Sequence, residues 1–330
     1  MGLSPAKLEK DTMKTKAPFI DQPGLYTLDH EAYHADPCIT PSLTSSIAKV
    51  LLRKSPRHAH AEHPRLTPKP KEEASDKFDL GQAAHALLLH EERKFAVNDG
   101  DSWRGNVAGI PSAKWKAQQR GDGKIPILFQ QLEETREMVA ECRRLLPDAE
   151  ASEAFDMELG TTERTLVWHE AGGVVCRCKL DWIPNDLKAR RAAFYDYKST
   201  RASAHPDDWS KTGYGFDVDL QAAFYIRGLK KLFGVEEPRM RFVVQENYEP
   251  YELSVVELTP AALAFAERKV ERALALWRLC MKKDLWPGYP TRIAYIQPPA
   301  YAEQEWLERE EREPIDDNML ERMIDWNRPD

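Results

Sequence analysis

The sequence has few cysteines and no long apolar run, and each absence excludes a class of protein. Its 330 residues include five cysteines, an odd number without regular spacing, which argues against a disulfide framework. No stretch of about 18 consecutive apolar residues occurs, so no membrane-spanning helix is expected. The N-terminus lacks a signal-peptide pattern, and Ala6 stands where myristoylation favours Ser or Thr. We therefore expect a cytoplasmic location.

Internal repeats are also absent, and the composition of 42% hydrophobic and 31% charged residues is typical of a soluble globular protein. The length allows two domains of about 150 residues or one elaborated α/β domain. We expect a flexible N-terminal arm over residues 1–24 and a single domain over residues 25–300. Residues 97–127 are rich in Gly and Pro and are predicted to be an insertion in that domain.

The net charge of −7 is carried by a predicted acidic C-terminal tail, residues 301–330. Positions 303–330 contain eleven Asp and Glu against four Arg, whereas the preceding residues hold 43 acidic and 43 basic side chains. Residues 1–302 have no net charge, and their basic side chains can still cluster in a channel on one face. The negative net charge of the chain therefore does not exclude a nucleic-acid partner. The tail is either solvated or docked on a partner or a neighbouring subunit.

Two adjacent stretches, residues 176–183 and 194–200, alternate apolar and polar side chains as half-buried strands do. The polar segment between them begins with turn-forming residues, which favours an antiparallel hairpin. If Ile183 lies opposite Phe194, then Asp181 lies opposite Asp196 and both project from the same side of the sheet. Further strands are expected near residues 163–170, 240–247 and 251–258, and packing helices near residues 128–146 and 263–281.

The paired aspartates make this hairpin the candidate site. Lys198 follows Asp196 by two residues and therefore shares its side of the strand. Two like charges facing each other destabilise a sheet unless a cation lies between them, and Mg²⁺ prefers such oxygen ligands. The alternative is that both carboxylates are solvated. Cys176 and Cys178 alternate with Asp181, so we expect buried thiols on the opposite face, together with Leu180 and Trp182.

Two predicted helices carry further candidates. The helix over residues 216–233 places Gln221 and Tyr225 four residues apart, which makes them neighbours on one face. The helix over residues 78–89 carries His85 in an otherwise apolar pattern, either as a hydrogen-bonded core residue or as a metal ligand.

These elements together resemble a known nuclease superfamily. Asp181 followed by Asp196-Tyr-Lys198 on a hairpin resembles the core of the PD-(D/E)XK nucleases, with Leu180 where the name has Pro. Gln221-x-x-x-Tyr225 matches an element of RecB-like nucleases, and Gly81-x-x-x-His85 matches the helix that bears their metal-binding His. Together with Tyr33, Ser45-Ser46 and Ser55-Pro56, the set resembles the RecE-like (exonuclease VIII) nuclease domain over residues 25 to about 300.

The resemblance implies a fold and an activity. The fold would be α/β, a restriction-endonuclease-like core with a mixed central sheet flanked by helices. The activity would be a Mg²⁺-dependent DNA exonuclease, with Mn²⁺ able to substitute, that degrades one strand of duplex DNA from its 5′ end and leaves 3′ overhangs. Such enzymes act at double-stranded DNA ends in prophage recombination with a single-strand annealing protein, and they form ring-shaped tetramers.

The resemblance also assigns roles to residues. His85, Asp181, Asp196 and the backbone carbonyl of Tyr197 would hold the metal. Lys198 would orient or deprotonate the attacking water or stabilise the transition state, and Gln221 and Tyr225 would hold phosphate or the catalytic groups. Basic residues expected to contact DNA phosphates are Arg53, Lys54, Arg57, Lys188, Arg190 and Arg191, although a solvated helix end explains the first three equally well.

Three alternatives remain open at this point. The chain could be a RecB-like or CRISPR-adaptation-type nuclease or endonuclease of the same superfamily. It could be a catalytically silent DNA-binding module, or a scaffold that recruits proteins through its acidic tail. Likewise, Trp103 and Trp115 in the insertion could either stack on bases or lie in an irregular surface segment.

Overall fold

The computed structural model describes residues 19–68, 78–90, 94–187, 192–313, 315 and 318–320. It divides into two compact units, residues 1–288 and residues 289–330. The first unit contains all the predicted site residues that are described. The second contains α10 (Ala300–Arg312), a helix with acidic residues along its length and no buried side chain. Within the described ranges, no helix is both long and apolar enough to cross a membrane.

The first unit is built on a six-stranded mixed sheet with the strand order β1-β6-β7-β8-β9-β10. Strands β8 and β9 are parallel, and every other neighbouring pair is antiparallel. The bounds are β1 (Gly24–Thr27), β6 (Gly160–Glu170), β7 (Val174–Pro184), β8 (Ala193–Thr200), β9 (Arg239–Glu246) and β10 (Leu253–Glu257). A parallel pair requires a crossover connection, which the helices between β8 and β9 provide.

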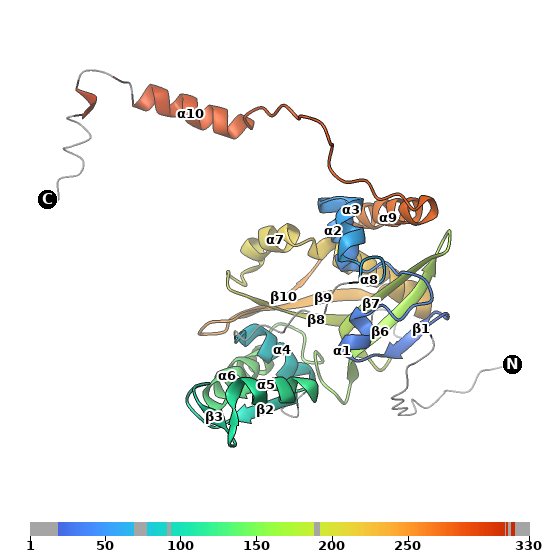
Figure 1. Ribbon diagram of the computed structural model, residues 1–330, viewed down its shortest axis with the longest axis vertical. Coiled ribbons are helices and arrows are strands. Elements are labelled where there is room, and N and C mark those ends of the chain that lie inside the picture. The colour runs from blue at the N-terminus through green and yellow to red at the C-terminus, as the bar shows by residue number, and fades with distance from the viewer. Residues whose placement is uncertain are drawn as a thin grey trace. The chain divides into compact units, whose positions relative to one another are not determined.

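Helices cover both faces of this sheet (Figure 1). On one face the core is formed with α2 (Ser45–Arg53), α3 (Pro56–Glu62), α7 (Pro206–Gly215), α8 (Val218–Phe233) and α9 (Pro260–Lys283). On the other face it is formed with α4 (Leu80–His90) and α6 (Phe129–Leu145). The short helix α1 (His30–His34) follows β1. The expected fold class, a mixed sheet flanked by helices, is confirmed.

The segment predicted as an insertion contains regular structure. Strands β2 (Phe95–Asn98) and β5 (Ile125–Leu128) pair in parallel, and β3 (Asn106–Val107), β4 (Ile110–Pro111) and α5 (Ser112–Gly121) lie between them in sequence. The rings of Trp103 and Trp115 are 6.0 Å apart, and the Lys116 ammonium lies 5.2 Å from the Trp103 ring. The two tryptophans therefore pack against each other within the insertion.

The predicted helix over residues 216–233 forms, but it begins later. Helix α7 ends at Gly215, Asp217 adopts a left-handed conformation with φ of +50°, and α8 starts at Val218. Phe216 lies in this break and is 63% exposed, so the predicted start of the helix at residue 216 was two residues early. The two helices form because the left-handed residue interrupts the backbone hydrogen-bond ladder between them.

The faces of β7 also depart from simple alternation. Cys176, Cys178 and Leu180 are buried on the α8 face as expected, whereas Trp182 packs in the core cluster on the α4 face. The ladder between β6 and β7 lacks the pair at Asp181, and its would-be partner Glu163 has φ of +51°. A local irregularity of this kind redirects side chains, because the period of two no longer holds across it.

A buried polar network joins the N-terminal segment to the sheet. Asp36 is 1% exposed and accepts hydrogen bonds from the backbone N–H and hydroxyl of Ser42 at 2.8 and 2.9 Å. The Arg177 guanidinium of β7 lies 2.8 Å from its carboxylate, and His63 at the end of α3 lies 3.2 Å from it. Burial raises the pKa of Asp36, but the bonds from His63, Arg177 and Ser42 outweigh it, and the net pKa is lowered.

We expect Asp36→Asn to destabilise the protein by about 3 to 5 kcal/mol at neutral pH, because the Arg177 charge would stay buried without its counter-ion. Since the folded pKa of Asp36 lies below the unfolded value, its contribution is complete above the unfolded pKa and is lost as pH falls through the folded pKa. Urea unfolding of both proteins at pH 7, 5 and 3 should therefore show the difference shrinking in acid.

The exposed residue Asp122 provides the control, and Asp122→Asn should match the parent at every pH. A constant difference between Asp36→Asn and the parent across the pH series would contradict an ionic role for Asp36.

Candidate active site

The candidate site lies where β7 and β8 separate. Trp182 pairs with Tyr195, which is the register that places Asp181 across from Asp196. Beside this pair, the carboxylate of Asp181 accepts a hydrogen bond from the backbone N–H of Tyr197 at 2.8 Å. A side-chain oxygen thus takes the place that a strand carbonyl would occupy in a continuing ladder. This bond orients Asp181 toward β8, and the predicted hairpin register is confirmed.

Helix α4 places His85 against Asp181, with 3.2 Å between His85 Nε2 and Asp181 Oδ2. Burial raises the pKa of Asp181, but the charge and hydrogen bond of His85 lower it more, so the net pKa is lowered. In His85, burial lowers the pKa and Asp181 raises it, and the net pKa is raised. The two side chains remain 33% and 16% exposed, so solvent reaches this part of the site.

Asp196 is more deeply buried, at 2% exposure, and is held from two elements. Gln221 of α8 donates from Nε2 to Asp196 Oδ1 at 2.8 Å. The ammonium of Lys198 forms an ion pair with Oδ2, which accepts no hydrogen bond of good geometry from the described residues. Burial raises the pKa of Asp196 to about 6, with Lys198 opposing the shift and the charge of Asp181 adding to it. The ammonium of Lys198 therefore does not fully offset the effect of burial on this carboxylate.

Gly81 explains how His85 reaches the sheet. A Cβ atom on Gly81 would lie 2.0 Å from the hydroxyl oxygen of Ser199 and 2.5 Å from its Cβ, so α4 packs against β8 only without a side chain there. His85 follows four residues later, one turn along the same face of the helix. The Gly-x-x-x-His spacing thus combines a close helix contact with a side chain directed at Asp181.

The two predicted tyrosines have different surroundings. The hydroxyl of Tyr197 donates to Gln245 Oε1 at 2.7 Å, and its ring lies 6.2 Å from that of His85, so the side chain braces the site from the α4 face. Tyr225 is buried on α8, and burial raises its pKa well above the usual value, which keeps its hydroxyl neutral.

The sequence reasoning missed Lys49 of α2. Its ammonium lies 3.5 Å from Gln221 Oε1, on the amide whose nitrogen holds Asp196. The available signal was a single Lys inside the otherwise apolar run Ile47-Ala48-Lys49-Val50-Leu51-Leu52. A helix that packs its apolar face on α8 and α9 carries this residue to the site.

The predicted phosphate contacts fall into two groups. Arg53 pairs with Asp217 and donates to the carbonyl of Gly215, and Lys54 lies 3.1 Å from Glu62. Arg57 lies in the first turn of α3, which Ser55 caps. The other group, Lys188, Arg190 and Arg191, lies outside the described residues. All six remain predicted DNA contacts.

The donor chemistry at the site suits a hard divalent cation. The register places two carboxylates across from each other, one oxygen of Asp196 is buried without a hydrogen bond, and an imidazole lies beside Asp181. Within the described ranges, no three His, Cys, Asp or Glu side chains are drawn together as a formed metal site. Instead, His85 lies beside Asp181 and Lys198 forms an ion pair with Asp196. The residues fit a divalent metal by their donor chemistry.

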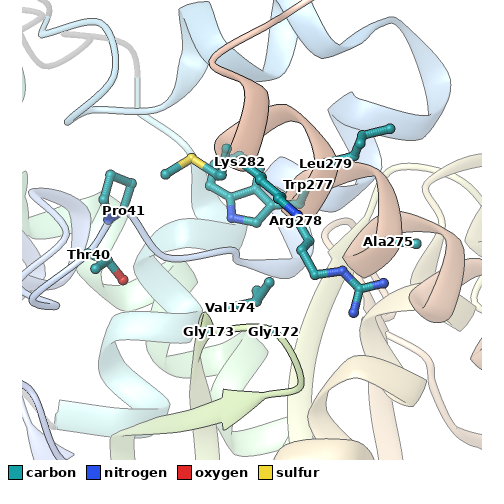
Figure 2. Close-up of a pocket in the computed structure, with 11 residues that line it drawn as sticks. Thr40, Pro41, Gly172, Gly173, Val174, Ala275, Trp277, Arg278, Leu279 and Lys282 are labelled. Atoms are coloured by element: carbon teal, nitrogen blue, oxygen red, sulfur yellow. The ribbon is translucent and has the colours of Figure 1, made fainter.

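The site is separate from a cavity of about 810 Å³ near the turn between β6 and β7. Figure 2 shows Thr40 and Pro41 on one side of this cavity and Trp277 and Arg278 of α9 on the other. None of the candidate site residues lines it. Arg278 packs over Gly172, whose missing Cβ would lie 2.4 Å from the Arg278 side chain.

Comparison with known proteins identifies the family. A family described as a PDDEXK-like domain of unknown function (DUF3799) matches residues 44–299, well over half of the chain. The chain belongs to this family. Its members' description agrees with the PD-(D/E)XK resemblance, which is thereby confirmed and supports a nuclease. Nucleases of this type generally use divalent metals. No curated protein matches the sequence.

A solved structure is similar to this PDDEXK-like domain in fold. A protein of Eubacterium rectale, described as a candidate exonuclease, has a TM-score of 0.50 at 12% identity, covering 84% of this chain and 98% of its own. The structure of LHK-Exo in complex with dAMP has 16% identity over 61% of this chain and 92% of its own, but its TM-score of 0.21 is too low to support a conclusion. The first likeness supports the fold alone.

We expect Gly81→Ala to weaken this PDDEXK-like domain, although Ala is the better helix former by about 1 kcal/mol. The new methyl group would force α4 away from β8, at a cost of about 1 to 3 kcal/mol, and would carry His85 away from Asp181. Thermal unfolding should show the loss, and Ser199→Gly should restore stability in the double variant by removing the clashing side chain. Equal losses with and without Ser199→Gly would contradict the close contact.

Proposed function

We propose that this protein is a divalent-metal-dependent exonuclease that degrades duplex DNA from 5′ ends and leaves 3′ single-stranded overhangs. The main support is the arrangement of Asp181, Asp196 and Lys198 at the opening between β7 and β8, in a chain that belongs to a PDDEXK-like family. The polarity and the duplex substrate rest on the resemblance to RecE-like nucleases.

Each site residue has a role in this proposal. His85, Asp181, Asp196 and the carbonyl of Tyr197 would hold Mg²⁺ or Mn²⁺. When bound, the ion lowers the pKa of a water molecule and offsets charge on the reacting phosphate. The N–H of Tyr197 fixes the orientation of Asp181, and the amide of Gln221 does the same for Asp196. Lys198 places its ammonium beside Asp196, where it orients the attacking water or stabilises the transition-state charge.

Further parts of the proposal concern partners. We infer from the same resemblance that the protein assembles as a homo-oligomer, a ring of four subunits, and acts with a single-strand annealing protein in phage-type recombination. The acidic segment that contains α10 exposes Tyr301, Trp306 and Leu307 and is a suitable surface for such a partner. Size-exclusion chromatography with light scattering measures the subunit number directly.

The activity is tested on three forms of one plasmid: closed circular, singly nicked and linear. We expect the linear form to be degraded in Mg²⁺ or Mn²⁺ and all three to persist in EDTA. Strand polarity follows from linear duplexes labelled at either the 5′ or the 3′ end. Cleavage of the closed circle would identify an endonuclease, and binding without cleavage a silent DNA-binding module, and either result would overturn the exonuclease proposal.

Two substitutions should separate the metal ligands from Lys198. Asp196→Asn removes a charge that holds the cation, so Mn²⁺ affinity and turnover should both be lost. Lys198→Ala removes a competing positive charge, so Mn²⁺ affinity should persist or increase while turnover falls about 10²- to 10³-fold. Calorimetric titration with Mn²⁺ and single-turnover digestion of a labelled duplex measure the two effects. Digestion by Lys198→Ala at the parent rate would show that Lys198 has no catalytic role.

A further inference from the structure

The ammonium of Lys49 has only a weak polar partner. Lys49 is half-buried in the middle of α2. The one hydrogen bond of its ammonium to the described residues goes to Gln221 Oε1 at 3.5 Å, the outer limit of such a bond. Within the described part of the chain, no carboxylate lies within ion-pair distance of it. A charged ammonium removed from water usually requires an anion or several strong acceptors, because burial penalises the charged form.

The carboxylates around Lys49 are already paired with other cations. Asp196 pairs with Lys198, and Asp219 lies 2.8 Å from Lys269. Asp217 pairs with Arg53 and lies 3.4 Å from Lys269. Among the described residues at this side of the site, Lys49 is therefore the cation without a carboxylate partner.

The electrostatics agree with this geometry. Burial and the charge of Lys198 lower the pKa of Lys49 to about 8, although Asp217, Asp196 and Asp219 oppose the shift. At neutral pH the side chain is still mostly protonated. The ammonium groups of Lys49 and Lys198 repel each other, and an anion bound at Lys49 would relieve this repulsion.

We propose that Lys49 binds a phosphate group of the DNA strand that is cut. This inference rests on the proposed nuclease function and adds a substrate contact to it. The phosphate is either an internucleotide diester close to the cleaved bond or a 5′-terminal monoester, since both present anionic oxygens. Lys49 also contacts the amide of Gln221, and that amide holds Asp196. In this proposal, Gln221 therefore links the residue that binds the phosphate to the carboxylate of Asp196.

The competing explanation is that Lys49 only supports Gln221. The two explanations differ in one measurable respect. If Lys49 contacts a phosphate, removing the Lys charge and removing the phosphate charge both break the same contact. The two losses of DNA affinity then do not add. If Lys49 only supports Gln221, its removal costs the same whichever phosphate is neutral.

The test combines Lys49→Met, which retains most of the apolar stem, with three short duplexes. One has a 5′-phosphate and ordinary diesters, one has a 5′-hydroxyl, and one has neutral methylphosphonates at the first three 5′ linkages. DNA affinity is measured by fluorescence anisotropy in Ca²⁺, and digestion rate in Mg²⁺. On the first duplex, Lys49→Met should bind about 10- to 100-fold more weakly, as expected for a lost charge-assisted hydrogen bond.

The duplex on which Lys49→Met and the parent become equal identifies the phosphate. Equality on the 5′-hydroxyl duplex indicates the terminal monoester, and equality on the methylphosphonate duplex indicates a diester. The same fold-loss on all three duplexes would overturn the inference. Lys283→Met, at an exposed position near the end of α9, controls for the loss of one positive charge and should weaken binding equally and slightly on every duplex.

Two further variants keep the outcome decisive. Lys49→Arg should recover most of the affinity, and its thermal unfolding, measured beside that of Lys49→Met, shows whether either variant has lost its fold. If Lys49→Met does not fold, the same comparison is made with Lys49→Gln and Lys49→Arg. If the parent binds but digests none of the duplexes, the nuclease proposal fails, while the anisotropy data still decide whether Lys49 contacts phosphate.

Discussion

The repulsion between Asp181 and Asp196 is the constraint around which this structure is arranged. Two carboxylates brought together by one strand register repel each other, and burial together with the charge of Asp181 raises the pKa of Asp196. The fold compensates with groups from three elements: His85 from α4, Gln221 from α8, and Lys198 together with the Tyr197 amide from β8. Helices α4 and α8, on opposite faces of the sheet, thus each contribute one group to the paired carboxylates.

Close packing makes these contributions possible. Gly81 allows α4 to contact β8 at Ser199, and Gly228 allows α8 to lie against Trp168, where a Cβ would come within 2.9 Å of the indole ring. With larger side chains at these two positions, both helices would stand further from the sheet. His85 and Gln221 would then be moved away from the aspartates. The small residues thus determine the site geometry without touching any reacting group.

Two buried acidic groups show how surroundings separate a structural role from a proposed catalytic one. Asp36 is surrounded by donors from Ser42, His63 and Arg177, and its net pKa is lowered. Asp196 has one amide and one ammonium, and burial raises its pKa to about 6. The first is fully compensated by the protein and fastens the N-terminal segment to β7. In the second, these two partners do not offset the effect of burial, which is the condition expected of a cation ligand.

The sequence by itself determined the features that depend on local pattern. Strand alternation and the turn before residue 188 were enough to predict the antiparallel register, the opposition of Asp181 and Asp196, and the buried thiols of Cys176 and Cys178. Tertiary structure alone decided that Trp182 lies on the other face, that Lys49 reaches Gln221, and that Arg53 pairs with Asp217. The physical reason is distance along the chain. Periodicity reports which face a residue takes within one element, whereas Lys49 and Gln221, or Gly81 and Ser199, meet only when separate elements pack together.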